Sequence, residues 1–367
     1  MVADVTASVA DLQARIKEIA ARGRRCRIVG GGTKPWLQPA DGESLLSTAS
    51  LAGIVEYEPS ELVIVAGGGT PVAEIERVMQ THGQMLAFEP PLGRADAAGA
   101  TRSATLGGTL AAQASGPRRA YAGAVRDFVL GVRIIDGKGE VLRFGGKVMK
   151  NVAGFDLARA VCGSAGTLGV IAEVALKCLP LPKATVTQVY ELDAEAAVVA
   201  MNRWHAEADP ISATTWVDGR LHVRFSGAEP AVRAAVTRRG GDALTDADAW
   251  WMAWREQTHP FFALPGQVMR MSCRSSLPPL EGFTQAIEWG GALRWLHAAT
   301  EVDRSRVRYW AHRAHGHATR WHASLAESLN DLTPEVRALH RRIKQTFDPY
   351  GIFPALDPVS AEAAKTH

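Results

Sequence analysis

The stretch Ala104-Thr-Leu-Gly-Gly-Thr-Leu-Ala-Ala-Gln-Ala-Ser-Gly-Pro-Arg118 decides the fold, because it sets two adjacent glycines before a run of small, helix-compatible residues. Gly107 and Gly108 let the backbone approach a ligand that any side chain would hold away. Amides at the start of the helix that follows are expected to point at an anion. The stretch therefore predicts a ligand held mainly by main-chain atoms.

Two further glycine clusters lie upstream, each after a short β-branched run: Gly30–Thr33 after Ile28-Val29, and Gly67–Thr70 after Leu62–Val65. Consecutive amides can form an anion-binding nest, to which Thr33 adds a hydroxyl and Lys34 a charge. A tight turn without a ligand is the competing interpretation of each cluster alone. Together they indicate a large phosphate-bearing cofactor. Neither a G-x-G-x-x-G fingerprint with a downstream acid nor a P-loop motif is present, which argues against a standard nicotinamide site and an NTPase.

The composition narrows the class of protein further. The 367 residues are 47% apolar and 22% charged with a net charge of +3, which is typical of a soluble globular protein and predicts no nucleic-acid binding. No C-x-x-C pair occurs, so we expect reduced thiols rather than a zinc or iron–sulfur site. No signal-peptide core and no apolar run of 18 residues is present, so we expect a cytoplasmic protein without a transmembrane helix. The four cysteines are Cys26, Cys162, Cys178 and Cys273.

Composition also changes along the chain. Glycine becomes sparse after Pro182, and most of the tryptophans follow it. We expect one domain over 1–182 and an α+β domain of alternating strands and helices over 183–332. A helix and return segment are expected over 333–356, and a disordered tail over 357–367. No internal sequence repeat is evident.

Six motifs in a fixed order, and one in the second domain, resemble a known family. The six are Ile28–Thr33, Ala104–Gly108, Ala114–Pro117, Arg126–Gly131, Lys150–Asp156 and Gly163–Ile171. They resemble the FAD-binding domain of the vanillyl-alcohol-oxidase (PCMH-type) flavoproteins, and more closely the FAD-binding subunits of bacterial glycolate oxidases (the GlcE type). Trp289-Gly-Gly-Ala-Leu-Arg-Trp295 is also similar to those subunits. The likeness covers nearly the whole chain, is most specific between residues 100 and 180, and is weaker from 183 to 330.

The resemblance implies an α+β fold, with a PCMH-type FAD-binding domain of two α+β subdomains and a cap domain with a ferredoxin-like sheet. It also implies cofactor contacts in four groups. These are Val29, Gly30, Gly31, Gly32, Thr33 and Lys34 at the pyrophosphate; Pro91, Thr105, Gly107, Gly108, Ser115 and Gly116 along the pyrophosphate, ribityl chain and flavin; Arg126 and Asp127 supporting that wall; and Gly166, Leu168, Gly169 and Ile171 around the adenosine.

Some of these residues also suit roles other than cofactor binding. Ala111, Ala112 and Ala114 offer a smooth surface for a flat ring, or serve close packing of a helix on a sheet. Asp127 is equally compatible with a capping role. The first glycine loop and the stretch 104–118 contain no His, Cys or Tyr that could attach a flavin covalently, so we expect FAD bound non-covalently.

A catalytic centre is less evident. Oxidation of a 2-hydroxy acid calls for an arginine to hold the carboxylate and a base to take a proton. The histidine-rich metal motif of the fuller catalytic relatives is missing, and the run His312–His317 contains no acid, so we expect no metal. The tail also departs from the family pattern after Phe353. Arg270, Arg294 and His297 remain candidates, each equally compatible with a structural role.

The resemblance predicts an FAD-binding subunit of a glycolate (2-hydroxy acid) oxidase complex, an oxidoreductase whose flavin accepts or relays electrons from a CH–OH group. Its expected partners are a sister flavoprotein subunit and an iron–sulfur subunit, and any membrane contact, at the inner face, would come through them. Two alternatives stay open: a non-catalytic FAD-bound scaffold, and a stand-alone 2-hydroxy acid flavin dehydrogenase.

Overall fold

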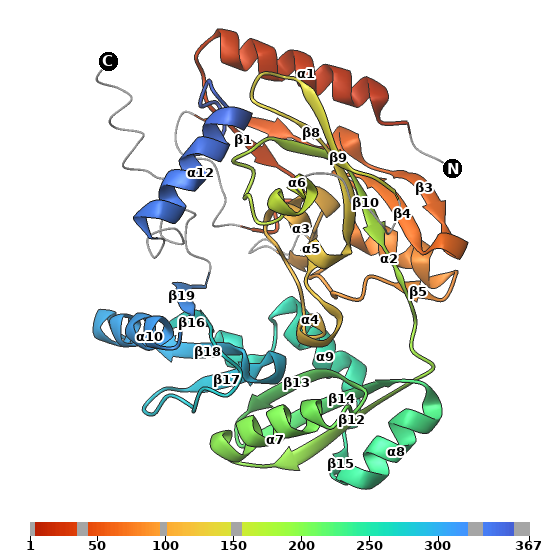
Figure 1. The fold of residues 1–367 in the computed structure, drawn as a ribbon, viewed down its shortest axis with the longest axis vertical. Helices are drawn as coiled ribbons and strands as arrows, with labels where there is room; N and C mark the ends of the chain where they lie inside the picture. Colours follow the sequence, from red (N-terminus) through yellow and green to blue (C-terminus); the bar gives the residue numbers. More distant parts are fainter. Residues whose placement is uncertain (1–3, 35–42, 96–100, 148–155, 322–332, 356–367) are drawn as a thin grey trace.

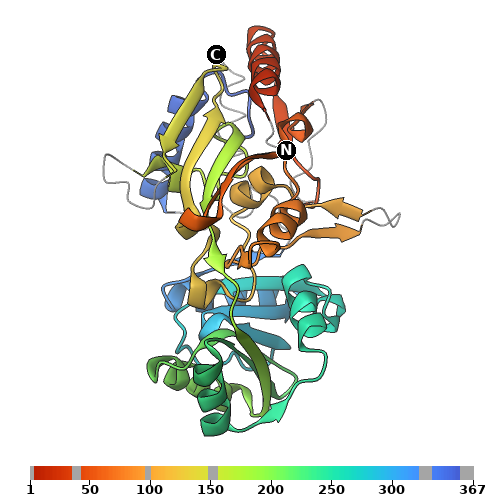
Figure 2. The ribbon, with the colours of Figure 1, turned by 90° about the vertical axis from the view of Figure 1, so that its right-hand side faces the viewer.

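The computed structural model describes residues 4–34, 43–95, 101–147, 156–321 and 333–355, which form two stacked lobes (Figures 1 and 2). The first lobe carries the glycine loops and receives the C-terminal helix. The second begins with a strand at Ala184. The motif Lys150–Asp156, apart from Asp156, and the tail 357–367 lie outside the described residues.

A small parallel sheet and a long helix open the first lobe. Strand β1 (Cys26–Val29) pairs with β2 (Ser44–Ser47), and α1 (Thr6–Ala21) packs over them. Val9, Leu12 and Ile16 of α1 recur at helical spacing and are fully buried. The helix is therefore amphipathic, and its apolar face lies in the core next to β1 and β2.

A five-stranded antiparallel sheet forms the body of this lobe, in the order β3-β4-β10-β8-β9. The turn after residue 135 is held by the Asp136 carboxylate, which accepts the N–H groups of Lys138 and Glu140, both at 2.9 Å. The strands are β3 (Ile54–Glu58), β4 (Val63–Gly67), β8 (Val129–Ile135), β9 (Val141–Gly145) and β10 (Val170–Lys177). The helices are α2 (Val72–Gln80), α3 (Leu106–Ala111), α4 (Arg119–Ala122), α5 (Val125–Phe128) and α6 (Leu157–Ala160), and the short strands are β5 (Gln84–Met85), β6 (Gly93–Ala95), β7 (Thr101–Ser103) and β11 (Leu179–Pro180).

The second lobe is built on an eight-stranded antiparallel sheet, β15-β12-β14-β13-β17-β18-β16-β19. Its first half follows the β-α-β-β-α-β order of a ferredoxin-like unit, as the resemblance implied. The elements of that half are β12 (Ala184–Glu191), α7 (Ala194–Ala206), β13 (Ile211–Val217), β14 (Arg220–Gly227), α8 (Glu229–Arg239) and β15 (Asp242–Ala243). They are followed by α9 (Ala247–Glu256).

The second half repeats this strand order with a loop in place of the first helix. It consists of β16 (Gln267–Ser272), β17 (Gln285–Glu288), β18 (Leu293–Ala298), α10 (Glu301–Arg313) and β19 (His317–Arg320). The halves join where β13 pairs with β17, through Thr215 opposite Glu288 and Trp216 opposite Ile287. The sheet is therefore a repeat of topology that the sequence does not reveal.

The chain then returns to the first lobe through α12 (Pro334–Phe347), as expected. The amide of Gly137 donates to the carbonyl of Phe347 at 2.8 Å, and Lys344 Nζ donates to the carbonyl of Thr167 at 2.8 Å. Beyond the helix, the carbonyl of Ile352 accepts the amide of Cys26 at the start of β1. The return segment is thus part of the core beneath α1.

Candidate active site

Two adjoining cavities run from the glycine loops of the first lobe to the sheet of the second. The smaller, of about 90 Å³, follows the loop after β1. The larger, of about 380 Å³, lies between the lobes. Both are lined by Thr33, Lys34, Ala111 and Ala165, so they form one continuous cleft. Its size and position are typical of a cofactor site between domains.

The loop after β1 offers unpaired donors to the smaller cavity. Within the described chain, the amides of Gly31, Gly32 and Thr33 donate to no acceptor. Gly31 lies so close to β7 that an added Cβ would stand 1.6 Å from the carbonyl oxygen of Ser103. Gly32 has a φ of +65°, which favours glycine. Unpaired amides beside Lys34 fit the oxygens of a pyrophosphate.

The amides at the start of α3 are hydrogen-bonded within the protein, which differs from the expectation drawn from the sequence. The amides of Leu106 and Gly107 donate to the carbonyls of Thr70 and Gly68 at 2.9 and 2.7 Å. The amide of Gly108 donates to Thr105 Oγ1 at 3.3 Å. The idea that these amides point at an anion is therefore wrong, because packing against the neighbouring chain already satisfies them. Gly107 and Gly108 still line the smaller cavity as bare backbone.

Small residues after α3 form one wall of the larger cavity. Ala111, Ala112, Ala114 and Ser115 all line it. Gln113 among them has a φ of +51°, and its amide donates to the carbonyl of Leu110 at 2.9 Å. Short side chains on a tight turn give the smooth surface that a flat ring system requires.

Most of the expected cofactor residues line one of the two cavities, and three do not. The three are Arg126, Asp127 and Leu168. Asp127 caps α5 by accepting the amide of Ala124 at 2.8 Å, and Leu168 is buried in the core of the lobe. Those that line a cavity are Val29, Gly30, Gly31, Gly32, Thr33, Lys34, Pro91, Thr105, Gly107, Gly108, Ser115, Gly116, Gly166, Gly169 and Ile171.

The opposite wall of the larger cavity carries two arginines around one tryptophan. The guanidinium carbon of Arg119, on α4, lies 4.4 Å from the ring centroid of Trp289, and that of Arg270, on β16, lies 5.0 Å from it. Neither guanidinium has a hydrogen bond or an ion pair with any described residue. Burial and the nearby charge of Arg119, which outweigh the opposing charge of Glu288, lower the pKa of Arg270 to about 10.

A buried carboxylate stands next to this pair. Glu288 lines the same cavity, is 4% exposed, and accepts a hydrogen bond from Trp295 Nε1 at 2.6 Å. Burial raises the pKa of Glu288 to about 7 against the opposing effects of Trp295 and Arg270. This wall therefore combines two cations with a carboxyl group that titrates near neutral pH.

The other two catalytic candidates lie away from the cleft. Arg294 is fully buried within the second lobe and donates to the carbonyl of Leu277 at 2.5 Å. A ring nitrogen of His297, Nε2, lies 2.9 Å from the carbonyl oxygen of Phe261. Neither side chain lines the cavity, so their contacts are structural. Arg119 and Glu288 were missed by the sequence reasoning; the only signal was that Glu288 immediately precedes the Trp289–Trp295 motif.

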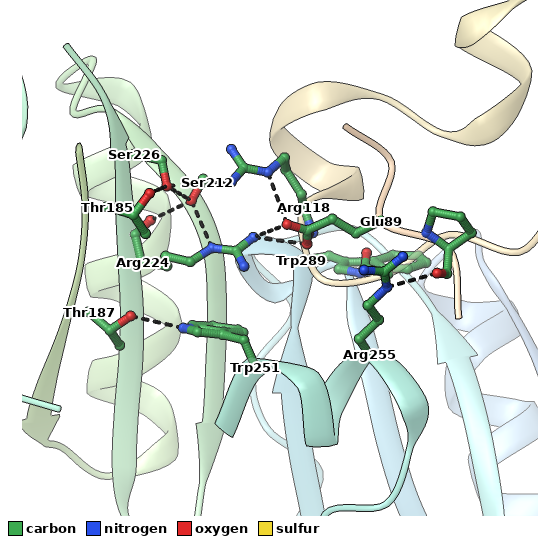
Figure 3. A network of polar contacts seen from close by, with 12 residues as sticks. Glu89, Arg118, Thr185, Thr187, Ser212, Arg224, Ser226, Trp251, Arg255 and Trp289 are labelled. Atoms are coloured by element: carbon green, nitrogen blue, oxygen red, sulfur yellow. Dashed lines mark hydrogen bonds and ion pairs between the residues drawn. The ribbon is translucent and has the colours of Figure 1, made fainter. Parts of the chain in front are cut away.

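Buried ion pairs fix the two lobes across the cleft (Figure 3). The carboxylate of Glu89, in the loop after β5, accepts hydrogen bonds from Arg118 of its own lobe, at 3.1 Å, and from Arg224 of β14, at 2.8 and 2.9 Å. Arg255 of α9 donates to the carbonyl of Pro90 at 2.8 Å. Glu89 has a φ of +46°, so these contacts hold a conformation that is unfavourable for a non-glycine residue. The cap is thus tied to the loop that carries Pro91 into the cleft.

Comparison with known proteins agrees with this architecture. The profile of a family described as FAD binding domain matches residues 3–145. The glycolate oxidase subunit GlcE of Escherichia coli is 42% identical over 328 residues, covering 89% of this chain and 90% of that protein. The chain belongs to the GlcE family of glycolate oxidase subunits.

More distant relatives of this GlcE-family chain share less of its length. The glycolate oxidase subunit GlcD of Bacillus subtilis is 31% identical over 185 residues, half of this chain and 37% of that one. A solved structure of alkyldihydroxyacetonephosphate synthase superposes with a TM-score of 0.67 at 14% identity, covering 95% of this chain and 75% of that protein, and supports the fold alone.

These findings confirm the predicted family, the α+β PCMH-type fold, and the assignment to FAD-dependent oxidoreductases. FAD is the cofactor, and the unpaired amides and smooth wall of the cleft fit it. No helix within the described ranges is both long and apolar enough to cross a membrane.

Proposed function

We propose that this chain is the FAD-binding subunit of a complex that oxidises glycolate or a closely related 2-hydroxy acid. The observation that carries the proposal is the continuous cleft, which joins unpaired main-chain donors at one end to a half-buried cationic wall at the other. Full-length similarity to a glycolate oxidase subunit supports the choice of substrate class.

The residues of the cleft divide the work of holding the cofactor. The amides of Gly31, Gly32 and Thr33, with Lys34, would bind the pyrophosphate. The wall from Ala111 to Ser115 would lie against the flavin ring, without a covalent bond. Bound FAD supplies the acceptor for the hydride that a CH–OH group loses on oxidation. The second lobe would exclude water from that face.

The path of electrons out of the chain involves partner subunits in this proposal. The four cysteines are free and lie apart: Cys26 and Cys178 are buried, and Cys162 and Cys273 are half-buried. Burial raises the pKa of the Cys162 and Cys178 thiols to about 12, so both stay protonated. We propose a sister flavoprotein and an iron–sulfur subunit as partners, with the complex in the cytoplasm, at the inner membrane face only through those partners.

Purification tests this proposal in two steps. The chain alone should carry FAD that denaturation releases into the supernatant, since no covalent bond holds it. Co-expressed with its two partners, it should co-purify with an iron–sulfur protein, and the complex should reduce a dye with glycolate. A colourless chain that takes up no FAD on incubation would refute the proposal. Glycolate-dependent dye reduction by the chain alone would favour a stand-alone dehydrogenase. If the chain binds FAD but the complex turns over equally fast after this FAD is lost, a scaffold would be favoured.

A further inference from the structure

The cationic wall of the larger cavity carries two guanidinium groups that form no hydrogen bond or ion pair with any described residue. Arg119 and Arg270 both line the cavity and both approach the ring of Trp289, at 4.4 and 5.0 Å. Across the described residues, no carboxylate or carbonyl oxygen accepts from either guanidinium. By contrast, Arg118 and Arg224 each form an ion pair with the carboxylate of Glu89.

Two half-buried cations that share one aromatic ring and have no hydrogen-bonded partner are unfavourable unless a ligand binds them. Burial disfavours the charged form of each guanidinium. Repulsion from Arg126 adds to this at Arg119, and repulsion from Arg119 adds to it at Arg270, where Glu288 acts in the opposite direction. An arginine remains charged under these conditions because its pKa starts so high. An anion bound between the two guanidinium groups would offset both the cost of burial and the repulsion. Charges that lack a partner until a ligand binds are typical of a binding site rather than of a structural core.

The backbone that presents Trp289 is strained, which independently marks this wall. Trp289 has a φ of +55° and is followed by Gly290 at +65° and Gly291 at +101°. Its indole Nε1 donates to the carbonyl of Gly116 at 3.2 Å, so the ring is held from the opposite lobe. A bulky residue in the left-handed region persists only where surrounding contacts require it, and such positions concentrate at ligand sites. The strain fixes the aromatic surface on which both guanidinium groups rest.

We propose that Arg119 and Arg270, held on Trp289, bind the carboxylate of a 2-hydroxy acid, so that this chain has a substrate site of its own beside its FAD. This inference rests on the proposed function for the identity of the acid. A planar guanidinium pairs with a carboxylate through two parallel hydrogen bonds. The nearby carboxyl of Glu288 disfavours a dianion such as phosphate, so a small monocarboxylate suits the wall best.

Calorimetric titration of the FAD-loaded chain with methoxyacetate tests the site, because this acid has the carboxylate but no hydroxyl to oxidise. Methoxyacetamide, of similar shape and uncharged, is the matched ligand. We expect the acid to bind and the amide not to bind. Arg119→Met and Arg270→Met should each weaken methoxyacetate binding at least tenfold, and Arg270→Lys should weaken it less. Arg233→Met, on the exposed face of α8, should leave it unchanged.

Several results would overturn the assignment. Equal binding of acid and amide, or unchanged binding in both methionine variants that retain the wild-type unfolding temperature, would show that the arginines hold no carboxylate. Tighter binding of inorganic phosphate than of methoxyacetate would show that the site takes a phosphate-like anion rather than a monocarboxylate. If the chain carries FAD and supports an active complex but does not bind methoxyacetate, only this inference fails. If the chain never takes up FAD, and the FAD-free chain still binds methoxyacetate through the arginines, the proposed function fails instead.

Discussion

At the scale of single residues, Glu288 is a carboxyl group whose charge changes with pH near neutrality. Its pKa is raised by burial from 4.5 to about 7. Between these values the folded chain keeps a proton that the unfolded chain releases, so the free energy of unfolding falls as pH rises through this window. By pH 8 the loss amounts to about 3 kcal/mol, at 1.36 kcal/mol for each unit of pKa.

Glu288→Gln should therefore stabilise the chain at high pH. A glutamine oxygen still accepts from Trp295 Nε1 but never acquires the charge. We expect urea unfolding to show the variant up to about 3 kcal/mol more stable than the wild type at pH 8, with the difference shrinking as pH falls and vanishing only below about pH 4. The exposed Glu229→Gln is the control and should show no such pH dependence. A difference that does not change with pH would mean that Glu288 is ionised throughout.

The same titration should govern anion binding at the wall. Deprotonated Glu288 places a negative charge near Arg270, while Arg119, Arg255, Glu256 and His317 also line the cavity. We expect methoxyacetate affinity to fall as pH rises through about 7 in the wild type. In Glu288→Gln this step should be absent, as calorimetry at pH 6 and 8 would show. An identical pH profile in the variant would assign the titration to another group.

At the scale of elements, the loop after β1 is held by backbone contact with β7, and this makes its first glycines irreplaceable. A Cβ at Gly31 would stand 1.6 Å from the carbonyl oxygen of Ser103, which cannot move aside as a flexible side chain could. Gly31→Ala should displace the loop and its unpaired amides, and lower the FAD content of the purified chain at least tenfold. Gly146→Ala is the control, because no atom lies within 4 Å of its added Cβ. FAD content should be read from absorbance after denaturation; an unchanged content in Gly31→Ala would show that this loop does not hold the cofactor.

The same element-level view explains what the sequence could predict. Glycine loops, the Asp136 turn and α12 follow from local chemistry, since each depends on neighbours a few residues away. The Arg119–Trp289–Arg270 wall does not, because α4, β16 and the residues after β17 meet only when the lobes dock. The amides of α3 were misjudged for the same reason: their acceptors in Gly68 and Thr70 lie one element away. Arg294 and His297 looked equally plausible in sequence because alternation along β18 does not say which buried face meets the cleft.

At the scale of the whole molecule, the position of the cap sheet depends on contacts with the loop between Glu89 and Gly93. The amides of Leu92 and Gly93 donate to the carboxylate of Glu256 on α9 at 2.8 and 3.2 Å, in addition to the contacts of Glu89 and Arg255. Two arginines and one glutamate of the cap therefore contact four residues of this loop: Glu89, Pro90, Leu92 and Gly93. Because the cationic wall comes from both lobes, its spacing is set by this docking rather than by either lobe alone.

Glu89→Gln should weaken this docking strongly. Burial alone would raise the pKa of Glu89, but its ion pairs with Arg224 and Arg118 outweigh burial and hold the pKa below its usual value. Removing the charge leaves two arginines without a counterion, which costs about 3–5 kcal/mol in buried pairs. Stability that depends on a lowered pKa is present at neutral pH and is lost as pH falls through that pKa, so the difference from wild type should shrink in acid. Calorimetric unfolding at pH 7.5 should show a lower midpoint for Glu89→Gln, and Glu229→Gln should match the wild type. A variant as stable as the wild type at pH 7.5 would show that the lobes are held by apolar packing and that the ion pairs contribute nothing net.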